Sequence, residues 1–375
     1  MVLLYPRAYK YAVPVIAALL MARPSTAATT PQSFDKIAAL AQSARDQNKL
    51  DEALGYYRQA LMLKPTWKEG LWYASTILYD QERYPDAATG FKRFLAIDPK
   101  SAGALALLGL SEFELKDYRA SATHLEQARG LGVGNTTLAA ATLYHYALLL
   151  TRFGQFEAGG QMLLTFAQGG HETPAVMDAA GLAGLRRAWL PSEVPSQDAA
   201  MIRLAGRAMC AAVEHRDPEA REEFGRLVKT YPKQPDVHYL RGSWLLTVDP
   251  EAALAEFKSE LELNPQHVAA LVAVAMGYLS LGDATKALPF AERAVKAGPQ
   301  EVAAHAALGR VLTETGALDR AIQELQAAVK LAPDSPPVRI TLASAYAKAG
   351  RSKEAAQERA EFLRLRKLNE SPDTK

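Results

Sequence analysis

The sequence predicts an all-α fold, a solenoid of antiparallel helical hairpins stacked one on the next. Three observations lead to this prediction. Apolar residues make up 49% of the chain, and most of them recur every three or four positions, the spacing of one helix face. Short polar turns separate these helical stretches. Prolines close successive pairs of stretches at intervals of 33 or 34 residues, at Pro232, Pro265, Pro299 and Pro333, and again at Pro65 and Pro99. Units of this length bury their apolar faces only by stacking on their neighbours.

The first 27 residues differ from the rest of the chain and predict a signal peptide. Arg7 and Lys10 precede an apolar run from Tyr11 to Ala22, and small residues follow it at Ala27 and Ala28. The run holds about twelve residues, whereas a bilayer span needs about 20. We therefore expect cleavage after Ala27 or Ala28, export to the periplasm or the exterior, and no stable membrane span afterwards. An uncleaved membrane anchor is the alternative.

Residues 34–171 predict four hairpins. The first helix, over residues 34–47, carries Ile37, Ala41 and Ala44 on one face; the second carries Leu54 and Tyr57 and ends before Pro65. A polar turn at residues 48–51 joins them. The same pattern recurs three more times, through Leu78 and Phe91, through Leu108 and Leu125, and through Leu150 and Leu163. Each pair buries too little surface to be stable alone, so the four are expected to stack as one block.

Residues 172–198 interrupt the pattern and predict a connector. Thr173 and Pro174 open a single helix that is expected to run through Trp189, and a proline-broken loop follows from Pro191 to Ser196. Residues 199–368 then predict five hairpins. The charged last helix is expected to cap the open end of the stack, since a terminal repeat needs a polar outer face. Residues 369–375 are predicted to be a disordered tail.

Small residues, glycines and prolines recur at fixed places in these units and resemble the tetratricopeptide repeat (TPR) family, in an exported, bacterial-type form. A small residue in the first helix allows close helix approach, a glycine stops that helix and a proline stops the second. They are found at Gly109, Gly309, Ala147, Ala275 and Ala343, then at Gly154, Gly282, Gly316 and Gly350, and finally at Pro265, Pro299 and Pro333. The resemblance implies a right-handed superhelical solenoid of about nine repeats plus one extra helix.

Charge, cysteine content and motifs predict no catalytic, cofactor or metal site. The formal net charge of +2 does not favour nucleic acid as a partner. Cys210, the single cysteine, lies in an apolar helical stretch and is expected to be a core residue. The chain has no nucleophile elbow, phosphate loop or zinc-protease helix motif. An enzyme built near the connector, with His171, Glu172 and Glu193, is the alternative from another functional class.

In TPR-like proteins the first helices line a concave groove that often holds peptides. Aligned in this way, nine side chains are expected to face the groove, namely Trp72, Thr76, Tyr79, Phe113, Tyr144, Arg152, Tyr239, Ser243 and Arg310. Aromatic rings with occasional arginines suit peptide recognition; the same rings could instead pack against the next hairpin. One subclass grips a C-terminal carboxylate with lysine, arginine and paired asparagines on first helices, but the four asparagines here fall in turns or at the chain end.

The sequence thus predicts a non-enzymatic scaffold of the cell envelope whose partner is a protein or a peptide. The alternative within the same class is a scaffold for polysaccharide export machinery, a role that the resemblance to other TPR proteins suggests.

Overall fold

The computed structural model describes residues 33–134 and 136–370, and the regular structure within them is entirely helical, as predicted. The chain divides into two compact units, Met1–Leu149 and Leu150–Lys375, and each is described by itself below. The predicted signal peptide and residues 371–375 of the predicted tail lie outside the described residues. Within the described ranges, no helix combines the length and apolarity needed to cross a membrane.

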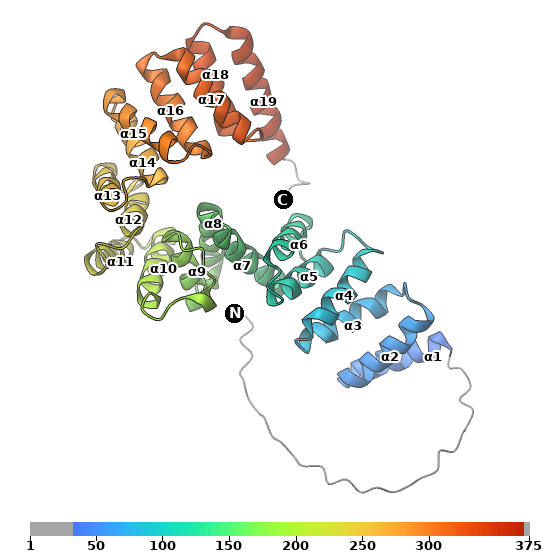
Figure 1. The fold of residues 1–375 in the computed structure, drawn as a ribbon. Coiled ribbons are helices and arrows are strands. Elements are labelled where there is room, and N and C mark those ends of the chain that lie inside the picture. Colours follow the sequence, from blue (N-terminus) through green and yellow to red (C-terminus); the bar gives the residue numbers. More distant parts are fainter. Residues whose placement is uncertain (1–32, 135, 371–375) are drawn as a thin grey trace, which may run out of the picture. The chain divides into compact units, whose positions relative to one another are not determined.

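Six helices of the N-terminal unit pair in chain order into three hairpins (Figure 1). They are α1 (Phe34–Asp46) with α2 (Leu50–Leu63), α3 (Lys68–Asp80) with α4 (Tyr84–Leu95), and α5 (Ala102–Glu114) with α6 (Tyr118–Leu131). Helix α2 also packs on α3, and α4 packs on α5, so each of the first two hairpins contacts the next. Their apolar stripes form a core in which Tyr57 and Phe91 are fully buried. Helix α7 (Thr136–Arg152) begins in this unit and ends in the other.

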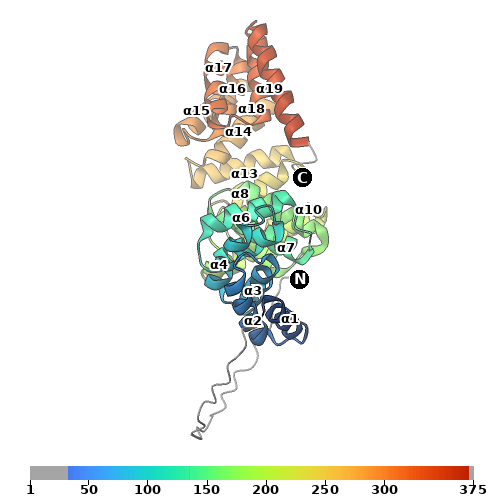
Figure 2. The same cartoon turned by 90° about the vertical axis from the view of Figure 1, so that its right-hand side faces the viewer.

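The C-terminal unit continues the same construction. Its helices are α8 (Phe156–Phe166), α9 (Pro174–Gly184), α10 (Ala199–Val213), α11 (Asp217–Thr230), α12 (Val237–Leu245), α13 (Pro250–Leu263), α14 (Val268–Ser280), α15 (Ala284–Ala297), α16 (Val302–Thr315), α17 (Leu318–Leu331), α18 (Pro336–Lys348) and α19 (Ser352–Glu370). Helices α14 to α19 form three hairpins stacked in order, with first helix against first helix (Figure 2). A π-helical turn, Ala167–His171, extends α8, and a 3₁₀ turn, Pro191–Glu193, lies in the loop after α9.

In the hairpins other than α12–α13, the turn places one residue in the left-handed conformation, which ends the first helix. The four predicted turn glycines Gly154, Gly282, Gly316 and Gly350 have φ between 74° and 83°. Other hairpins make the same turn, at φ of 57° to 62°, with Asn48, Glu82, Lys116 and His215. Close approach also accounts for the small residue in the first helix, since a Cβ on Gly309 would lie 2.4 Å from Cγ of Leu325.

The predicted connector helix is shorter than expected and is tightly packed. Helix α9 ends at Gly184 and not at Trp189, because Arg186 adopts a left-handed φ of 53° that turns the chain away. The helix lies against α10 at backbone contact distance: a Cβ on Gly181 would lie 2.0 Å from the carbonyl oxygen of Ile202. The contact buries Leu182 and other apolar residues of α9 completely. The extra helix is therefore an integral layer of the C-terminal unit.

Three hairpins of the C-terminal unit share a side-chain link, here called the clasp. A histidine or an arginine on the first helix, six residues after the proline of the preceding repeat, bridges the carbonyl of that proline and a glutamate of the second helix. His305 joins the Pro299 carbonyl (3.1 Å) to Glu324 (2.6 Å). The others are His238 with Pro232 and Glu256, and Arg339 with Pro333 and Glu358. Each histidine of the clasp uses both of its ring nitrogens, one toward the carbonyl and one toward the carboxylate.

Candidate functional site

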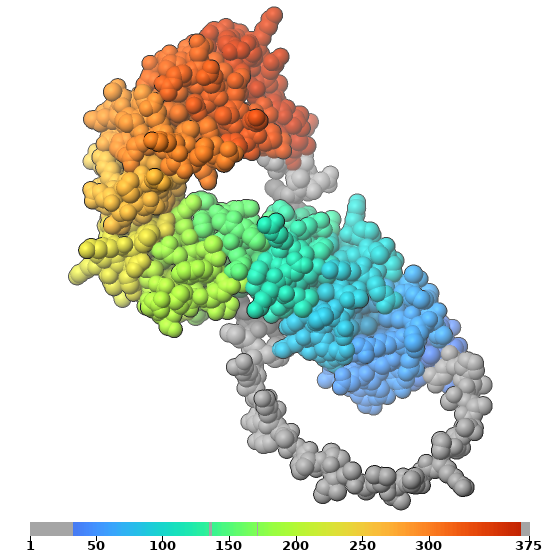
Figure 3. All heavy atoms as spheres, viewed as in Figure 1, coloured from blue at the N-terminus to red at the C-terminus, as the bar shows by residue number. Residues whose placement is uncertain are grey.

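A hollow of about 780 Å³ opens on the first-helix side of the C-terminal unit. Figure 3 shows this hollowed side between α8, in green, and the orange helices that begin with α14. We call it the central hollow. Its floor is the apolar face of α14, formed by Val268, Ala269, Val272 and Ala273. Its rim is polar, with Glu157, Arg186, Asp236, Asn264, Gln266, His267 and Glu301. An apolar floor with a few convergent polar groups is typical of a binding surface.

A second hollow, about 600 Å³, lies further along the same helices, and we call it the distal hollow. Its lining comes mainly from the last turns of α14 (Leu279), from α16 (Arg310, Thr313, Glu314) and from α18 (Ile340, Thr341, Ser344). Ala303 lines the central hollow and Arg310 the distal one, and residues seven apart lie on the same helix face. The two hollows are therefore successive parts of one strip along α14 and α16.

Tyr239 on α12 links the central hollow to a smaller one of about 240 Å³, which Ser243 also lines. The ring lies 5.7 Å from that of Phe257 and 4.8 Å from that of His267, and the Arg186 guanidinium sits 5.7 Å above it. Burial raises the pKa of the Tyr239 hydroxyl. Ser243 donates to the backbone carbonyl of Tyr239. Packing on both sides thus fixes this ring at the edge of the hollow.

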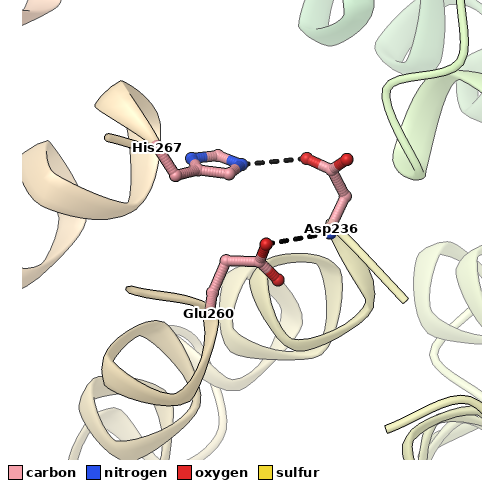
Figure 4. Close-up of side chains that lie close together, drawn as sticks. All are labelled: Asp236, Glu260 and His267. Atoms are coloured by element: carbon pink, nitrogen blue, oxygen red, sulfur yellow. Dashed lines mark hydrogen bonds and ion pairs between the residues drawn. The ribbon is translucent and has the colours of Figure 1, made fainter. Parts of the chain in front are cut away.

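Beside the central hollow, three buried side chains form the only potential metal-binding group among the described residues: Asp236, Glu260 and His267 (Figure 4). Their hydrogen bonds give them a capping role instead. The carboxylate of Glu260 accepts from the backbone N–H groups of Asp236 (3.0 Å) and Tyr239 (3.2 Å) at the start of α12. His267 Nδ1 accepts from the backbone N–H of Ala270 at the start of α14, so its Nε2 donates to Asp236 (2.9 Å).

Two arginines complete this network. Arg187 pairs with Asp236 at 3.0 Å, and the guanidinium of Arg186 approaches the same carboxylate at 3.9 Å. The arginines offset the buried negative charge and would repel a metal cation. The network therefore orients the starts of α12 and α14, which carry Tyr239 and the floor of the central hollow.

The candidate groove residues of the N-terminal unit are packed between helices. Trp72 is half-buried against Phe91 and Phe94, with ring centroids 6.1 and 5.6 Å away. Neighbouring rings likewise cover Tyr79 and Phe113, which are half-buried. The side chain of Tyr144 is only 8% exposed. The Thr76 hydroxyl donates a hydrogen bond to a backbone carbonyl of its own helix. Burial raises the pKa of the Tyr79 hydroxyl strongly. These side chains support the hairpin stack in this structure.

The remaining candidates lie in the C-terminal unit. Tyr239, Ser243 and Arg310 line the hollows described above, whereas Arg152 pairs with Glu193 at 2.5 Å. Glu193 also accepts from the backbone N–H of Leu190, and Glu172 pairs with Arg216 at 2.7 Å. Both carboxylates of the enzyme alternative thus hold the connector in place. The side chain of His171 lies outside the described set.

Sequence reasoning missed the floor of the central hollow and the rim residue Glu301. The floor residues are small and apolar, so they resemble ordinary helix-packing residues until the neighbouring helices are placed around them. The spacing of Ala269, Val272 and Ala273 on one helix face was the available clue, and by itself it did not distinguish an open face from a covered one.

Comparison with family models matches the tetratricopeptide repeat model to residues 38–102, 74–136, 248–302 and 275–336, half of the chain in all. The chain belongs to the tetratricopeptide repeat family. This confirms the family inferred from the recurring small residues, glycines and prolines. TPR chains present helical hairpins as surfaces for protein interaction, and this chain has that construction. No curated protein matches the sequence.

Several solved TPR structures resemble parts of the chain. MamA (residues 41 to the end) from Desulfovibrio magneticus RS-1 is 22% identical, with a TM-score of 0.41, over 47% of this chain and 99% of MamA. YrrB, described as a TPR protein with an unusual peptide-binding site, is 16% identical, with a TM-score of 0.37, over 44% of this chain and 86% of YrrB. A chain of the Cut9–Hcn1 hetero-tetramer of the APC/C is 16% identical, with a TM-score of 0.39, over 88% of this chain and 66% of that one.

Proposed function

We propose that this chain is a non-enzymatic TPR scaffold of the cell envelope that binds a protein or peptide partner along the first helices of its C-terminal unit. One observation carries the proposal: the central hollow has an apolar floor on α14 and a polar rim. Such a surface can bury apolar side chains of a partner while its rim groups fix their orientation. Placement in the envelope rests on the signal-like character of residues 1–27.

Partner capture by the full chain in its native cell tests the binding surface. Proximity labelling identifies the partner, and Ala269→Glu then places a charged side chain on the floor of the central hollow. We expect this variant to lose the labelled partner. Ala327→Glu is the matched control, because Ala327 is also a half-exposed helical alanine but lies on α17 and lines neither hollow. Equal labelling by the wild type and both variants would contradict the proposed surface.

Cell fractionation and N-terminal sequencing test the envelope placement. The expected result is a periplasmic or secreted protein that begins at Ala28 or Thr29. Recovery in the cytoplasm with an intact first residue would contradict export. A labelled partner from polysaccharide export machinery would identify the narrower scaffold role predicted as an alternative from the sequence.

A further inference from the structure

The strip along α14 and α16 carries a charged group at each end that the protein itself does not neutralise. Glu301 lines the central hollow and Arg310 lines the distal hollow, and both are exposed. Neither side chain forms a hydrogen bond or ion pair with any residue that the structure describes. The strip thus presents one free negative charge and one free positive charge, with apolar surface between them.

The other charged residues of the two hollows are already paired. Glu157 pairs with Arg186 in the central hollow, and Asp236 pairs with His267 and Arg187 as described above. In the distal hollow, Glu314 pairs with Lys348 at 2.8 Å. A charged ligand group can therefore bind at Glu301 or Arg310 without breaking an existing ion pair, whereas at the other positions it would have to displace one.

The distance between the two free charges determines what could bridge them. Glu301 is the N-cap residue before α16, and Arg310 lies nine residues further on in its third turn, so their backbone positions are about 13 Å apart along the helix axis. An extended peptide advances about 3.3 Å per residue, so about four residues cover this distance. Between the charges the strip offers Ala303 and the α14 floor, which accommodate small or apolar side chains.

We propose that the strip binds an extended peptide segment in which a basic and an acidic side chain stand about four residues apart, the basic one at Glu301 and the acidic one at Arg310. The inference rests on the proposed function and specifies its partner. It differs from a grip on a terminal carboxylate, because both ligand charges are on side chains and the pairing at Glu301 requires a cation. The ion pairs lie at a solvent-exposed surface, so high salt weakens this recognition.

Synthetic peptides with blocked ends test the charge pattern on the full chain. The probe is a fluorescent twelve-residue peptide of glycine, serine and alanine with one lysine and one aspartate four positions apart. Comparison peptides carry the same charges at adjacent positions, or glutamine and asparagine in their place. We expect the four-apart peptide to bind best, and each exposed ion pair to contribute up to about fivefold in affinity. Equal affinities for all three peptides would overturn the proposal.

Charge exchange provides the decisive control. Arg310→Gln should lower the affinity for the four-apart peptide. Arg310→Glu should bind a peptide with two lysines more tightly than the wild type does. Arg359→Gln should change nothing: Arg359 is exposed on α19, outside both hollows, and is also unpaired within the described chain. The assignment of Arg310 is wrong if Arg310→Glu binds the two-lysine peptide no better than the wild type does, and if Arg310→Gln and Arg359→Gln bind the four-apart peptide equally well.

The proposed function and this inference fail in distinguishable ways. If Ala269→Glu abolishes labelling of the native partner while Glu301→Gln and Arg310→Gln leave it intact, the surface is correct and the charge pattern is wrong. If Ala269→Glu also has no effect, the proposed surface itself is wrong.

Discussion

Substitution of Gly206 by alanine should strongly destabilise the C-terminal unit, because α9 and α10 touch through their backbones. A Cβ on Gly206 would lie 1.8 Å from the carbonyl oxygen of Met177, whereas ordinary contact begins near 3.4 Å. The two helices would have to separate by about 1.5 Å, and they cannot do so without loosening the side chains packed around them. Forced overpacking of this kind costs about 3 kcal/mol of unfolding free energy, the upper end of the usual range.

A second glycine gives the matched control. Gly225 is also within a helix, α11, but a Cβ there meets no atom within 4 Å. Gly225→Ala should therefore stabilise the protein by about 0.5–1 kcal/mol, since alanine loses less backbone entropy in a helix than glycine does. Both substitutions replace a helical glycine by alanine and share this gain, so the expected difference of about 3 kcal/mol between them comes from the helix contact alone.

Urea unfolding followed by circular dichroism measures the global effect, and hydrogen exchange at α9 and α10 measures the local one. The local measurement is needed because stacked repeats can unfold in separate parts. We expect Gly206→Ala to speed exchange in both helices and Gly225→Ala to leave it unchanged. If both variants unfold within 0.5 kcal/mol of each other and α9 exchanges no faster, the tight packing of the connector helix is wrong.

Three further predictions concern other buried contacts. His305→Ala should cost about 1–2 kcal/mol by leaving two acceptors of the clasp without donors, whereas His305→Arg, which copies the clasp of the last repeat, should cost less than half of that in urea unfolding. Burial opposes ionisation of the Glu112 carboxyl, but its hydrogen bond with His124 and its ion pair with Lys92 lower its pKa. Its stabilisation is complete above the usual glutamate pKa and is lost as pH falls through the lowered value. Glu112→Gln should thus cost about 2 kcal/mol at neutral pH and progressively less in acid, and a pH-independent cost would contradict this. The Cys210 thiol is fully buried, and burial raises its pKa to about 12. Thiol reagents should label it only as fast as the protein unfolds, and rapid labelling of native protein would refute the burial.

The sequence determined the secondary structure and the repeat because both depend on local chemistry. Helical spacing of apolar residues, the turn glycines and the closing prolines act within one hairpin, so they are visible without the fold. The close approach at Gly309 belongs to this group, because its contact, Leu325, lies in the same hairpin. The end of α9 at Gly184 could not be predicted from the sequence, because arginine as a residue type does not indicate the left-handed backbone that Arg186 adopts.

Tertiary structure decided which side chains are covered by other helices and which are exposed. Trp72 and Tyr79 suggested a groove by residue type, yet the neighbouring helices half-bury both. Glu301, which sequence reasoning passed over, stands unpaired at the rim of the central hollow. Exposure and pairing depend on where other helices lie, and that arrangement is set by packing between hairpins far apart in the chain. The sequence therefore determined a stack of TPR hairpins, and only the packed structure distinguished the residues that support the stack from those left exposed.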